Sequence, residues 1–165
     1  MGIKKDFKAG NDGEEIVNKL FQQQFFVGKN RTEHLSDYDL ACWDNVNPDP
    51  IFTIEVKNDL YAEKSGNIAL EFWNSRKDKP AGISATKANL WAHVIPNSGV
   101  WITSVKKLLD YVHSHPSFRT IFSGGDGNAD MYLYKMNDIL PSVFVECSKL
   151  TSDELRKTVG DLLNE

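Results

Sequence analysis

Glu55 and Lys57 are the residues of this sequence whose types and spacing best suit catalysis. They end the run Ile-Phe-Thr-Ile-Glu-Val-Lys, residues 51–57, which predicts a β-strand. Because side chains alternate between the two faces of a strand, Phe52 and Ile54 point into a core while Glu55 and Lys57 share the opposite face. An exposed ion pair of this kind contributes at most about 1 kcal/mol to stability, so we interpret it as catalytic rather than structural.

A second acid comes from the preceding predicted strand, residues 38–43. Asp37 and Asp39 share one face of this stretch, opposite Leu40. The Asn- and Pro-rich residues between the two strands predict a hairpin turn, and pairing through that turn brings Asp39 beside Glu55. Asp37 is the alternative ligand, although its position also suits a residue that caps the turn.

Two neighbouring carboxylates predict a divalent cation site. Their repulsion raises the pKa of one of them unless a cation neutralises the charge. Hard oxygen ligands suit Mg²⁺, with Mn²⁺ as a substitute, and the expected ligands are Asp39, Glu55 and the backbone carbonyl of Val56. Such an ion would polarise a phosphodiester and lower the pKa of a bound water. Lys57 would stabilise charge in the transition state, or orient or deprotonate the attacking water.

An acid near the N-terminus is a fourth candidate for this site. The sequence predicts a helix that begins near Asn11 and ends near Gln24, with Asn11 and Glu14 in the pattern of a capping box. Glu14 lies on the side of Phe21, which faces the protein body, whereas Glu15 lies on the solvent face. Glu14 therefore fits two compatible roles, a helix cap and a metal ligand that acts directly or through water.

An acid in one strand followed by Glu-x-Lys in the next resembles the PD-(D/E)XK nuclease superfamily. Tyr38 stands where the name of the motif has Pro, a position that varies within the superfamily. The Gly10-x-x-x-Glu14 helix start is similar to the first-helix acid of archaeal Holliday-junction resolvases and several exonucleases. Residues 81–91, Ala-Gly-Ile-Ser-Ala-Thr-Lys-Ala-Asn-Leu-Trp, look like a segment of small phage-encoded members. Together these likenesses cover roughly residues 10–103.

The resemblance implies an enzyme that hydrolyses DNA phosphodiester bonds with Mg²⁺. An endonuclease that acts on branched or duplex DNA is the favoured interpretation, such as a junction resolvase or a restriction-like or homing enzyme. A homodimer would suit symmetric cutting of both strands. Three alternatives stay open: an exonuclease of recombination or repair, a catalytically silent DNA-binding module, and an α/β domain in which Glu-Val-Lys is coincidental.

Glu71 and Lys87 are candidates for the surroundings of the site. Glu71 falls on the polar face of a predicted strand, residues 67–72, and could join the metal site if that strand neighbours Glu55. Lys87 shares a predicted helix face with Trp91, so its amine suits either a phosphate contact or a place on the surface with its stem against apolar neighbours.

The net charge of −4 does not by itself indicate a protein that binds nucleic acid. Binding depends on a local basic surface rather than on the total charge, and a carboxylate cluster that holds a cation adds negative charge of its own. Arg76 and Lys77 lie in a basic stretch that could supply part of such a surface. The ordinary alternative is that both are solvated surface residues.

The remaining composition indicates an ordinary globular protein. No apolar run approaches the roughly 20 residues that span a bilayer, and the N-terminus lacks the apolar stretch of a secretory signal, so we expect a cytosolic protein without a membrane partner. Cys42 and Cys147 lie in apolar stretches and predict buried free thiols. The histidines have no metal-ligand spacing, and His93 is expected to be structural.

Hydrophobic periodicity and turn signals predict a single-domain α/β fold with a mixed sheet flanked by helices. The resemblance implies that this central sheet is restriction-endonuclease-like. After the first helix we expect strands at residues 38–43, 51–58 and 67–72. A helix is expected next, with Ser84 as its N-cap and with Leu90 and Trp91 on it. The later expected elements are strands at 94–95 and 100–103, a helix at 104–113, strands at 131–135 and 143–147, and a final helix from Thr151.

Overall fold

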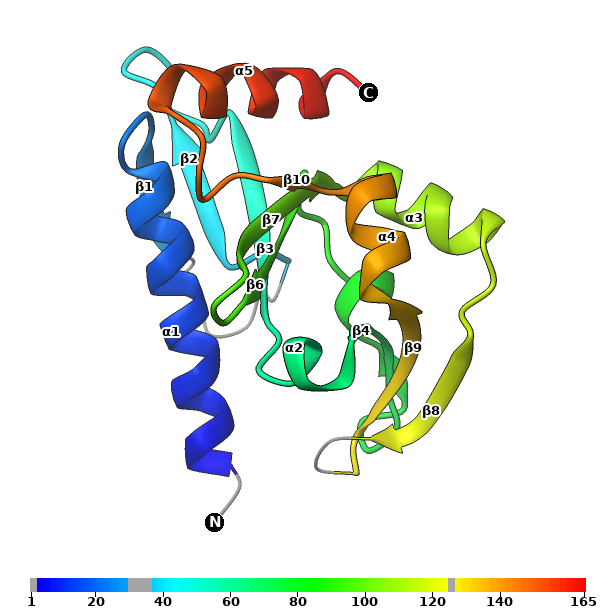
Figure 1. Cartoon of the computed structure of the whole chain (residues 1–165). Helices are drawn as coiled ribbons and strands as arrows, with labels where there is room; N and C mark the ends of the chain where they lie inside the picture. Colours follow the sequence, from blue (N-terminus) through cyan, green and yellow to red (C-terminus); the bar gives the residue numbers. More distant parts are fainter. Residues whose placement is uncertain (1–2, 30–36, 125–126) are drawn as a thin grey trace.

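A six-stranded mixed sheet forms one half of the protein, in a computed structural model that describes residues 3–29, 37–124 and 127–165 (Figure 1). Neighbouring strands follow the order β1-β2-β3-β6-β7-β10. The pair β3–β6 is parallel and the other pairs are antiparallel. The strands are β1 (Phe26–Lys29), β2 (Leu40–Trp43), β3 (Phe52–Asn58), β6 (Leu90–Ile95), β7 (Gly99–Ser104) and β10 (Val145–Glu146).

A second, antiparallel sheet has the strand order β5-β4-β9-β8. Its strands are β4 (Asn67–Asn74), β5 (Lys79–Pro80), β8 (Arg119–Gly124) and β9 (Ala129–Lys135). Strands β4 and β5 belong to the crossover that joins β3 to its parallel neighbour β6. The next strand after β3 in the chain is β4, and it therefore lies in the second sheet rather than beside Glu55.

Helices cover the first sheet and fill the space between the two sheets (Figure 1). Helix α1 runs beside β1 and β2, and α5 lies across one end of this sheet, while α3 and α4 lie toward the second sheet. The helices are α1 (Ile3–Phe21), α2 (Ala62–Ser65), α3 (Val105–Ser114), α4 (Met136–Val143) and α5 (Ser152–Leu163), with a 3₁₀ turn η1 (Gly82–Ser84). Within the described ranges, no helix combines the length and the apolar character needed to cross a membrane.

Two hydrophobic clusters correspond to these layers. The first packs α1 and α5 against the six-stranded sheet and includes Val17, Phe21, Phe52, Ile54, Leu155 and Val159. The second joins the four-stranded sheet to α3, α4 and β6 and includes Ile68, Leu70, Trp91, Leu108, Ile139 and Val143. Both sides of β6 are thus covered, since Leu90 and Ala92 belong to the first cluster and Trp91 and Ile95 to the second.

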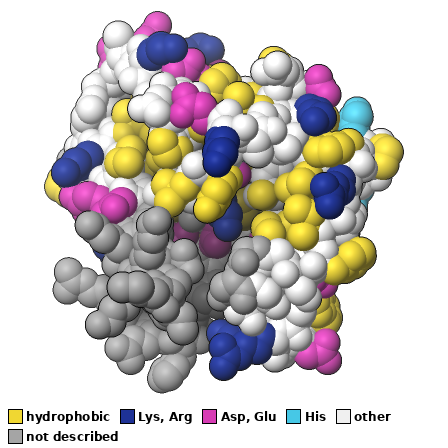
Figure 2. Space-filling view, turned by 60° about the horizontal axis from the view of Figure 1, so that its bottom comes forward, with side chains coloured by type: hydrophobic (Ala, Val, Ile, Leu, Met, Phe, Trp, Pro, Cys, Tyr) yellow, Lys and Arg dark blue, Asp and Glu magenta, His cyan; other side chains and the backbone are white. Residues whose placement is uncertain are grey.

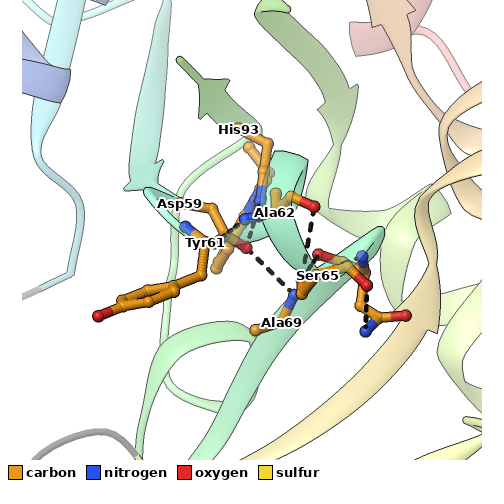
Figure 3. A network of polar contacts seen from close by, with 8 residues as sticks. Asp59, Tyr61, Ala62, Ser65, Ala69 and His93 are labelled. Atoms are coloured by element: carbon orange, nitrogen blue, oxygen red, sulfur yellow. Dashed lines mark hydrogen bonds and ion pairs between the residues drawn. The ribbon is translucent and has the colours of Figure 1, made fainter.

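A buried polar network centred on Asp59 ties the two sheets together (Figure 3). Asp59 follows β3 directly, and its carboxylate accepts hydrogen bonds from the backbone N–H groups of Ala62 and Ala69, which begin α2 and lie in β4. His93 of β6 lies 3.2 Å from the same carboxylate. Because the indole of Trp91 donates to Nδ1 of His93, the proton of the neutral ring lies on Nε2 and points at Asp59.

The helix expected after Ser84 is absent, and this prediction was wrong. Residues 90–95 form β6, whose six residues are all buried. A strand that is covered on both faces has a continuous apolar sequence without period-two alternation, so its pattern resembles that of a buried helix. Only the short turn η1 and an extended segment precede β6. Lys87 therefore lies on no helix, and the prediction that Lys87 and Trp91 share one helix face was wrong.

Other boundaries also differ from the expectations. Helix α1 begins at Ile3, so Asn11 lies inside the helix and the predicted capping box there was wrong. The expected strand at 143–147 is the end of α4 followed by the two-residue strand β10, and β1 and β8 were not predicted. Such short segments form strands only by pairing with residues far away in the chain, and the local sequence does not show this pairing.

Several local predictions are confirmed. The helices expected at 104–113 and from Thr151 are present as α3 and α5. In the structure the side chain of Ser104 caps α3 by accepting from the N–H of Lys107, and Thr151 forms a capping box with Glu154 at the start of α5. Cys42 and Cys147 are buried free thiols. In each case the signal is local, since a cap or an apolar stretch is specified by residues close together in the chain.

Candidate active site

The pairing of β2 with β3 brings Asp39 beside the acidic face of β3. Leu40 lies opposite Ile54 in an antiparallel register, and the N–H of Asp39 donates to the carbonyl of Ile54 at 3.0 Å. The ladder then ends, and the Asp39 side chain turns toward β3 instead. Its Oδ2 accepts a hydrogen bond of 2.7 Å from the N–H of Val56. The predicted pairing of the two strands is confirmed.

The backbone carbonyl of Val56 points to the same side of β3 as the Asp39 carboxylate. In an antiparallel ladder the N–H and C=O of one residue point to the same neighbouring strand. The N–H of Val56 bonds to Asp39, so its carbonyl also points toward β2. Strand β2 begins at Leu40, opposite Ile54, and the carbonyl of Val56 thus lies beyond the paired part of the ladder. An oxygen ligand is available there.

Glu55 lies on the face of β3 opposite the core, as the alternation predicted. Phe52 and Ile54 are buried, whereas Glu55 is half-buried. The pKa of Glu55 is raised to about 8, because desolvation by burial and the negative charge of Asp39 outweigh a hydrogen bond from Thr86 and the positive charge of Lys57. A carboxylate with so high a pKa is poorly neutralised by its own surroundings.

Asp39 shows the same effect. Its pKa is raised to about 6, because desolvation by burial and the charge of Glu14 outweigh the hydrogen bond from Val56 and the charge of Lys29. Glu14 also raises the pKa of Glu55. Three acids from α1, β2 and β3 therefore share one electrostatic environment, and their mutual repulsion favours a cation.

Glu14 reaches this environment because α1 packs closely on the end of β3. A Cβ at Gly13 would lie 2.7 Å from the Cβ of Asn58, so the absence of a side chain at Gly13 permits the close approach. Glu14 faces inward as predicted, and Glu15 pairs with Lys19 at the surface. The carboxylate of Glu14 forms an ion pair of 3.3 Å with Lys29 of β1.

Lys29 is the basic residue of the site that the sequence interpretation missed. It lies in β1, which was not among the predicted strands. Its ammonium pairs with Glu14 and lowers the pKa of Asp39. The alternation of the short run Phe-Val-Gly-Lys, residues 26–29, was the available signal, and it is too brief to identify a strand without its partner β2.

Thr86 is a second residue of the site, besides Lys29, that the sequence did not single out. Its hydroxyl lies 3.0 Å from Oε2 of Glu55, across a sequence separation of 31 residues. Nothing in the local sequence around Thr86 marks this contact, because it depends on how the segment after η1 crosses β3.

Asp37 and Lys87 lie together beside the site rather than in it. The ammonium of Lys87 pairs with the carboxylate of Asp37 at 3.1 Å, and the N–H of Lys87 donates to the carbonyl of Asp37 at 2.8 Å. The structure thus distinguishes the two rival acids, since Asp39 bonds to β3 and Asp37 bonds to the segment before β6.

Glu71 and the basic loop belong to the second sheet. Strand β4 pairs with β5 and β9 and not with β3, so the condition for placing Glu71 beside Glu55 is not met. Arg76 and Lys77 are exposed in the turn between β4 and β5. On the face shown in Figure 2, Lys and Arg side chains of the described residues are interspersed with acidic and hydrophobic ones.

The donor set suits a hard cation, although it is not a complete cage. Asp39, Glu55 and the carbonyl of Val56 offer oxygen atoms from two adjacent strands. Within residues 12–29, 37–124 and 127–165, no three side chains of the His, Cys, Asp and Glu types are arranged around one metal position. Glu14 is held by Lys29 instead. Sites of this kind suit Mg²⁺, which commonly keeps several waters and takes one or two carboxylates.

Comparison of the chain with protein-family models, with curated proteins and with solved structures finds no significant match. The interpretation of the site therefore rests on its own geometry and chemistry.

Proposed function

We propose that this protein is a Mg²⁺-dependent deoxyribonuclease with a restriction-endonuclease-like fold of the PD-(D/E)XK class. The observation that carries the proposal is the pair of carboxylates Asp39 and Glu55, which lie on adjacent strands with pKa values raised to about 6 and about 8. Lys57 shares their face of β3. Groups with strongly perturbed pKa values that gather in one place are candidates for catalysis.

Asp39, Glu55 and the carbonyl of Val56 are the groups that would hold the cation. Bound there, Mg²⁺ or Mn²⁺ would supply a positive charge that polarises a phosphodiester and lowers the pKa of a water molecule. Glu14 would take part directly or through water once its ion pair with Lys29 is exchanged. The excess of negative charge in the metal-free site favours this exchange.

In this proposal Lys57 assists the reaction at the phosphate or at the attacking water. Its ammonium lies on the same side of β3 as Glu55 and lowers the pKa of that carboxyl. A fixed cation beside the reacting phosphate stabilises the negative charge that develops during hydrolysis, and it can orient the attacking water. In this proposal Asp39 and Glu55 bind the ion, whereas Lys57 acts on the phosphate or the water.

The substrate class we propose is branched or duplex DNA that is cut internally. The support for this substrate class is the resemblance of the acid and Glu-x-Lys motif to PD-(D/E)XK nucleases, and the pairing of β2 with β3 brings Asp39 beside Glu55 and Lys57 as that motif requires. An exonuclease of recombination or repair would use the same three residues. The two activities differ in the products they release.

A panel of labelled DNAs tests the function. Linear duplex, single strand, four-way junction and plasmid are incubated with Mg²⁺ or Mn²⁺ and with EDTA. We expect cleavage only with the metal, and a loss of at least about 100-fold in Glu55→Ala and Lys57→Ala. Internal cuts support the endonuclease, and degradation from the ends supports the exonuclease. Binding of DNA without any cleavage would instead favour a silent DNA-binding module.

Asp161→Ala is a control for these variants. It removes an exposed acid of α5 that pairs with Lys157, so its cleavage rate should equal that of the unmodified protein. Equal rates in Glu55→Ala, Lys57→Ala and Asp161→Ala would contradict the assignment. Sedimentation of the protein with and without DNA determines whether a homodimer forms.

A further inference from the structure

Thr86 makes a side-chain hydrogen bond to the central carboxylate of the site from outside the two strands that carry it. Its hydroxyl lies 3.0 Å from Oε2 of Glu55 and 3.3 Å from the backbone carbonyl of Asp37. The N–H of Ala88 donates to the same hydroxyl oxygen at 3.2 Å. Since the oxygen accepts from Ala88, its single hydrogen is directed toward the acceptors, and the shorter distance leads to Glu55.

The position of Thr86 is set by the second sheet. The N–H groups of Ala85 and Thr86 both donate to the carbonyl of Gly82 at 3.0 Å. Gly82 has a φ of 50°, and a Cβ there would collide with the backbone carbonyl of Glu71 in β4. The turn η1 is thus held tightly against β4, and this close packing fixes the segment that presents Thr86 to Glu55.

We propose that Thr86 is a positioning residue for Glu55, which orients its carboxylate for the divalent cation. This inference rests on the proposed function. A threonine hydroxyl that donates to Oε2 restricts the rotation of the carboxylate and leaves Oε1 as the oxygen available to a cation. Partners that orient the ligands of a metal typically change metal affinity or activity by about 10- to 100-fold when they are removed.

The competing explanation is that Thr86 only stabilises the segment before β6. Thr53 provides a matched comparison, because it lies on the same face of β3 as Glu55 and bonds to the same segment. Its hydroxyl lies 3.1 Å from Oδ1 of Asn89, and the N–H of Asn89 lies 3.3 Å from that hydroxyl. Thr53→Val therefore removes a hydroxyl from the joint between β3 and this segment without touching the carboxylate.

The experiment compares Thr86→Val, Thr86→Ser and Thr53→Val in the full chain. Calorimetric titration with Mn²⁺ measures metal affinity, thermal melting without metal measures stability, and single-turnover cleavage of labelled DNA is followed across a range of Mg²⁺ concentrations. We expect Thr86→Val to weaken Mn²⁺ binding about 10- to 100-fold and to require correspondingly more Mg²⁺ for half-maximal cleavage. Thr86→Ser keeps the hydroxyl and should retain affinity within about threefold.

Thr53→Val should lower the melting temperature as much as Thr86→Val does, with unchanged Mn²⁺ affinity. Equal Mn²⁺ affinity in Thr86→Val and Thr53→Val would overturn the positioning role. A wild-type protein that binds Mn²⁺ through Glu55 but cleaves no DNA would contradict the proposed function and leave the role of Thr86 measurable. A wild-type protein that binds no Mn²⁺ would contradict both.

Discussion

The carboxylate of Asp39 lies against the backbone of Val56, with 2.7 Å between Oδ2 and the amide nitrogen, where the ladder between β2 and β3 ends. A side chain thus takes over from the backbone of β2 as the hydrogen-bond partner of β3. One carboxylate oxygen is used in this contact, and in the proposed site the other oxygen would bind the cation. The contact explains how Asp39, which directly precedes β2, is held beside Glu55 on β3.

The hydrogen bond between Asp39 and Val56 predicts different stabilities for two substitutions of Asp39. Asp39→Asn keeps an oxygen that can accept from Val56, whereas Asp39→Ala leaves that N–H without its partner. We expect both variants to lose cleavage by at least about 100-fold, and Asp39→Ala alone to lose about 1–3 kcal/mol of stability. Urea unfolding followed by tryptophan fluorescence measures the difference. Equal stability of the two variants would show that this hydrogen bond contributes nothing to the fold.

The raised pKa values predict how the metal-free protein responds to pH. Glu55 has a folded pKa of about 8 against an ordinary 4.5, and Asp39 one of about 6 against 3.8. An acid whose pKa is raised on folding disfavours the native state once it ionises, so stability is highest below these ordinary values and is lost as pH rises through about 6 and about 8. Melting curves in EDTA should therefore shift to lower temperature between about pH 5 and pH 9.

Glu55→Gln should reverse part of this loss. An amide keeps the shape of the side chain and an oxygen that can accept from Thr86, but it carries no charge to be desolvated or repelled by Asp39. One pKa unit corresponds to about 1.4 kcal/mol, so we expect the metal-free variant to melt about 5 °C or more above the unmodified protein near pH 9. At about pH 4 and below, where the Glu55 carboxyl is protonated in both the folded and the unfolded chain, the two should agree. A variant that is less stable at both pH values would contradict the proposed strain, whereas stabilisation with loss of cleavage is the signature of a functional site.

Lys29 provides a test of Glu14. In the metal-free structure its ammonium pairs with Glu14 and offsets the charge of Asp39. We expect Lys29→Met to lower the melting temperature without metal near pH 8 and to lower the Mg²⁺ concentration that gives half-maximal cleavage, because a competing cation is removed. Lys19→Met, which removes a surface partner of Glu15, is the control. If the Mg²⁺ requirement of Lys29→Met equals that of the control, Glu14 does not contribute to cation binding.

The pair Asp59 and His93 should be important for stability and not for chemistry. His93→Ala leaves the buried carboxylate of Asp59 with fewer partners, so we expect a loss of about 3–5 kcal/mol, against less than about 0.5 kcal/mol for the exposed His113→Ala. Hydrogen bonds from His93 and from the backbone N–H groups of Ala69 and Tyr61 overcome desolvation and hold the pKa of Asp59 below its ordinary value. Its contribution is therefore present above about pH 4 and is lost as pH falls. Urea unfolding of both variants at neutral and acidic pH measures these differences, and equal values for the two would mean that the network does not hold the sheets together.

Much of the fold and site could be predicted from short stretches of sequence. The alternation of residues 51–57 predicted that Glu55 and Lys57 share the face opposite Phe52 and Ile54, and the burial pattern of β3 confirms it. The helices expected at 104–113 and from Thr151 are present as α3 and α5. Each of these features depends on residues within one element, where the geometry of a helix or a strand relates sequence spacing directly to position in space.

The tertiary structure alone decided which distant residues meet. It bonded Asp39 to β3 and Asp37 to the segment before β6, brought Lys29 and Thr86 to the acids, and placed Glu71 in a different sheet. It also made residues 90–95 a central strand instead of part of a helix, because both faces of that strand are covered. Strand partners are selected by packing between segments far apart in the chain, and local periodicity carries no record of that selection. The acid–lysine face of β3 was thus determined by sequence, whereas its neighbours were determined by the fold.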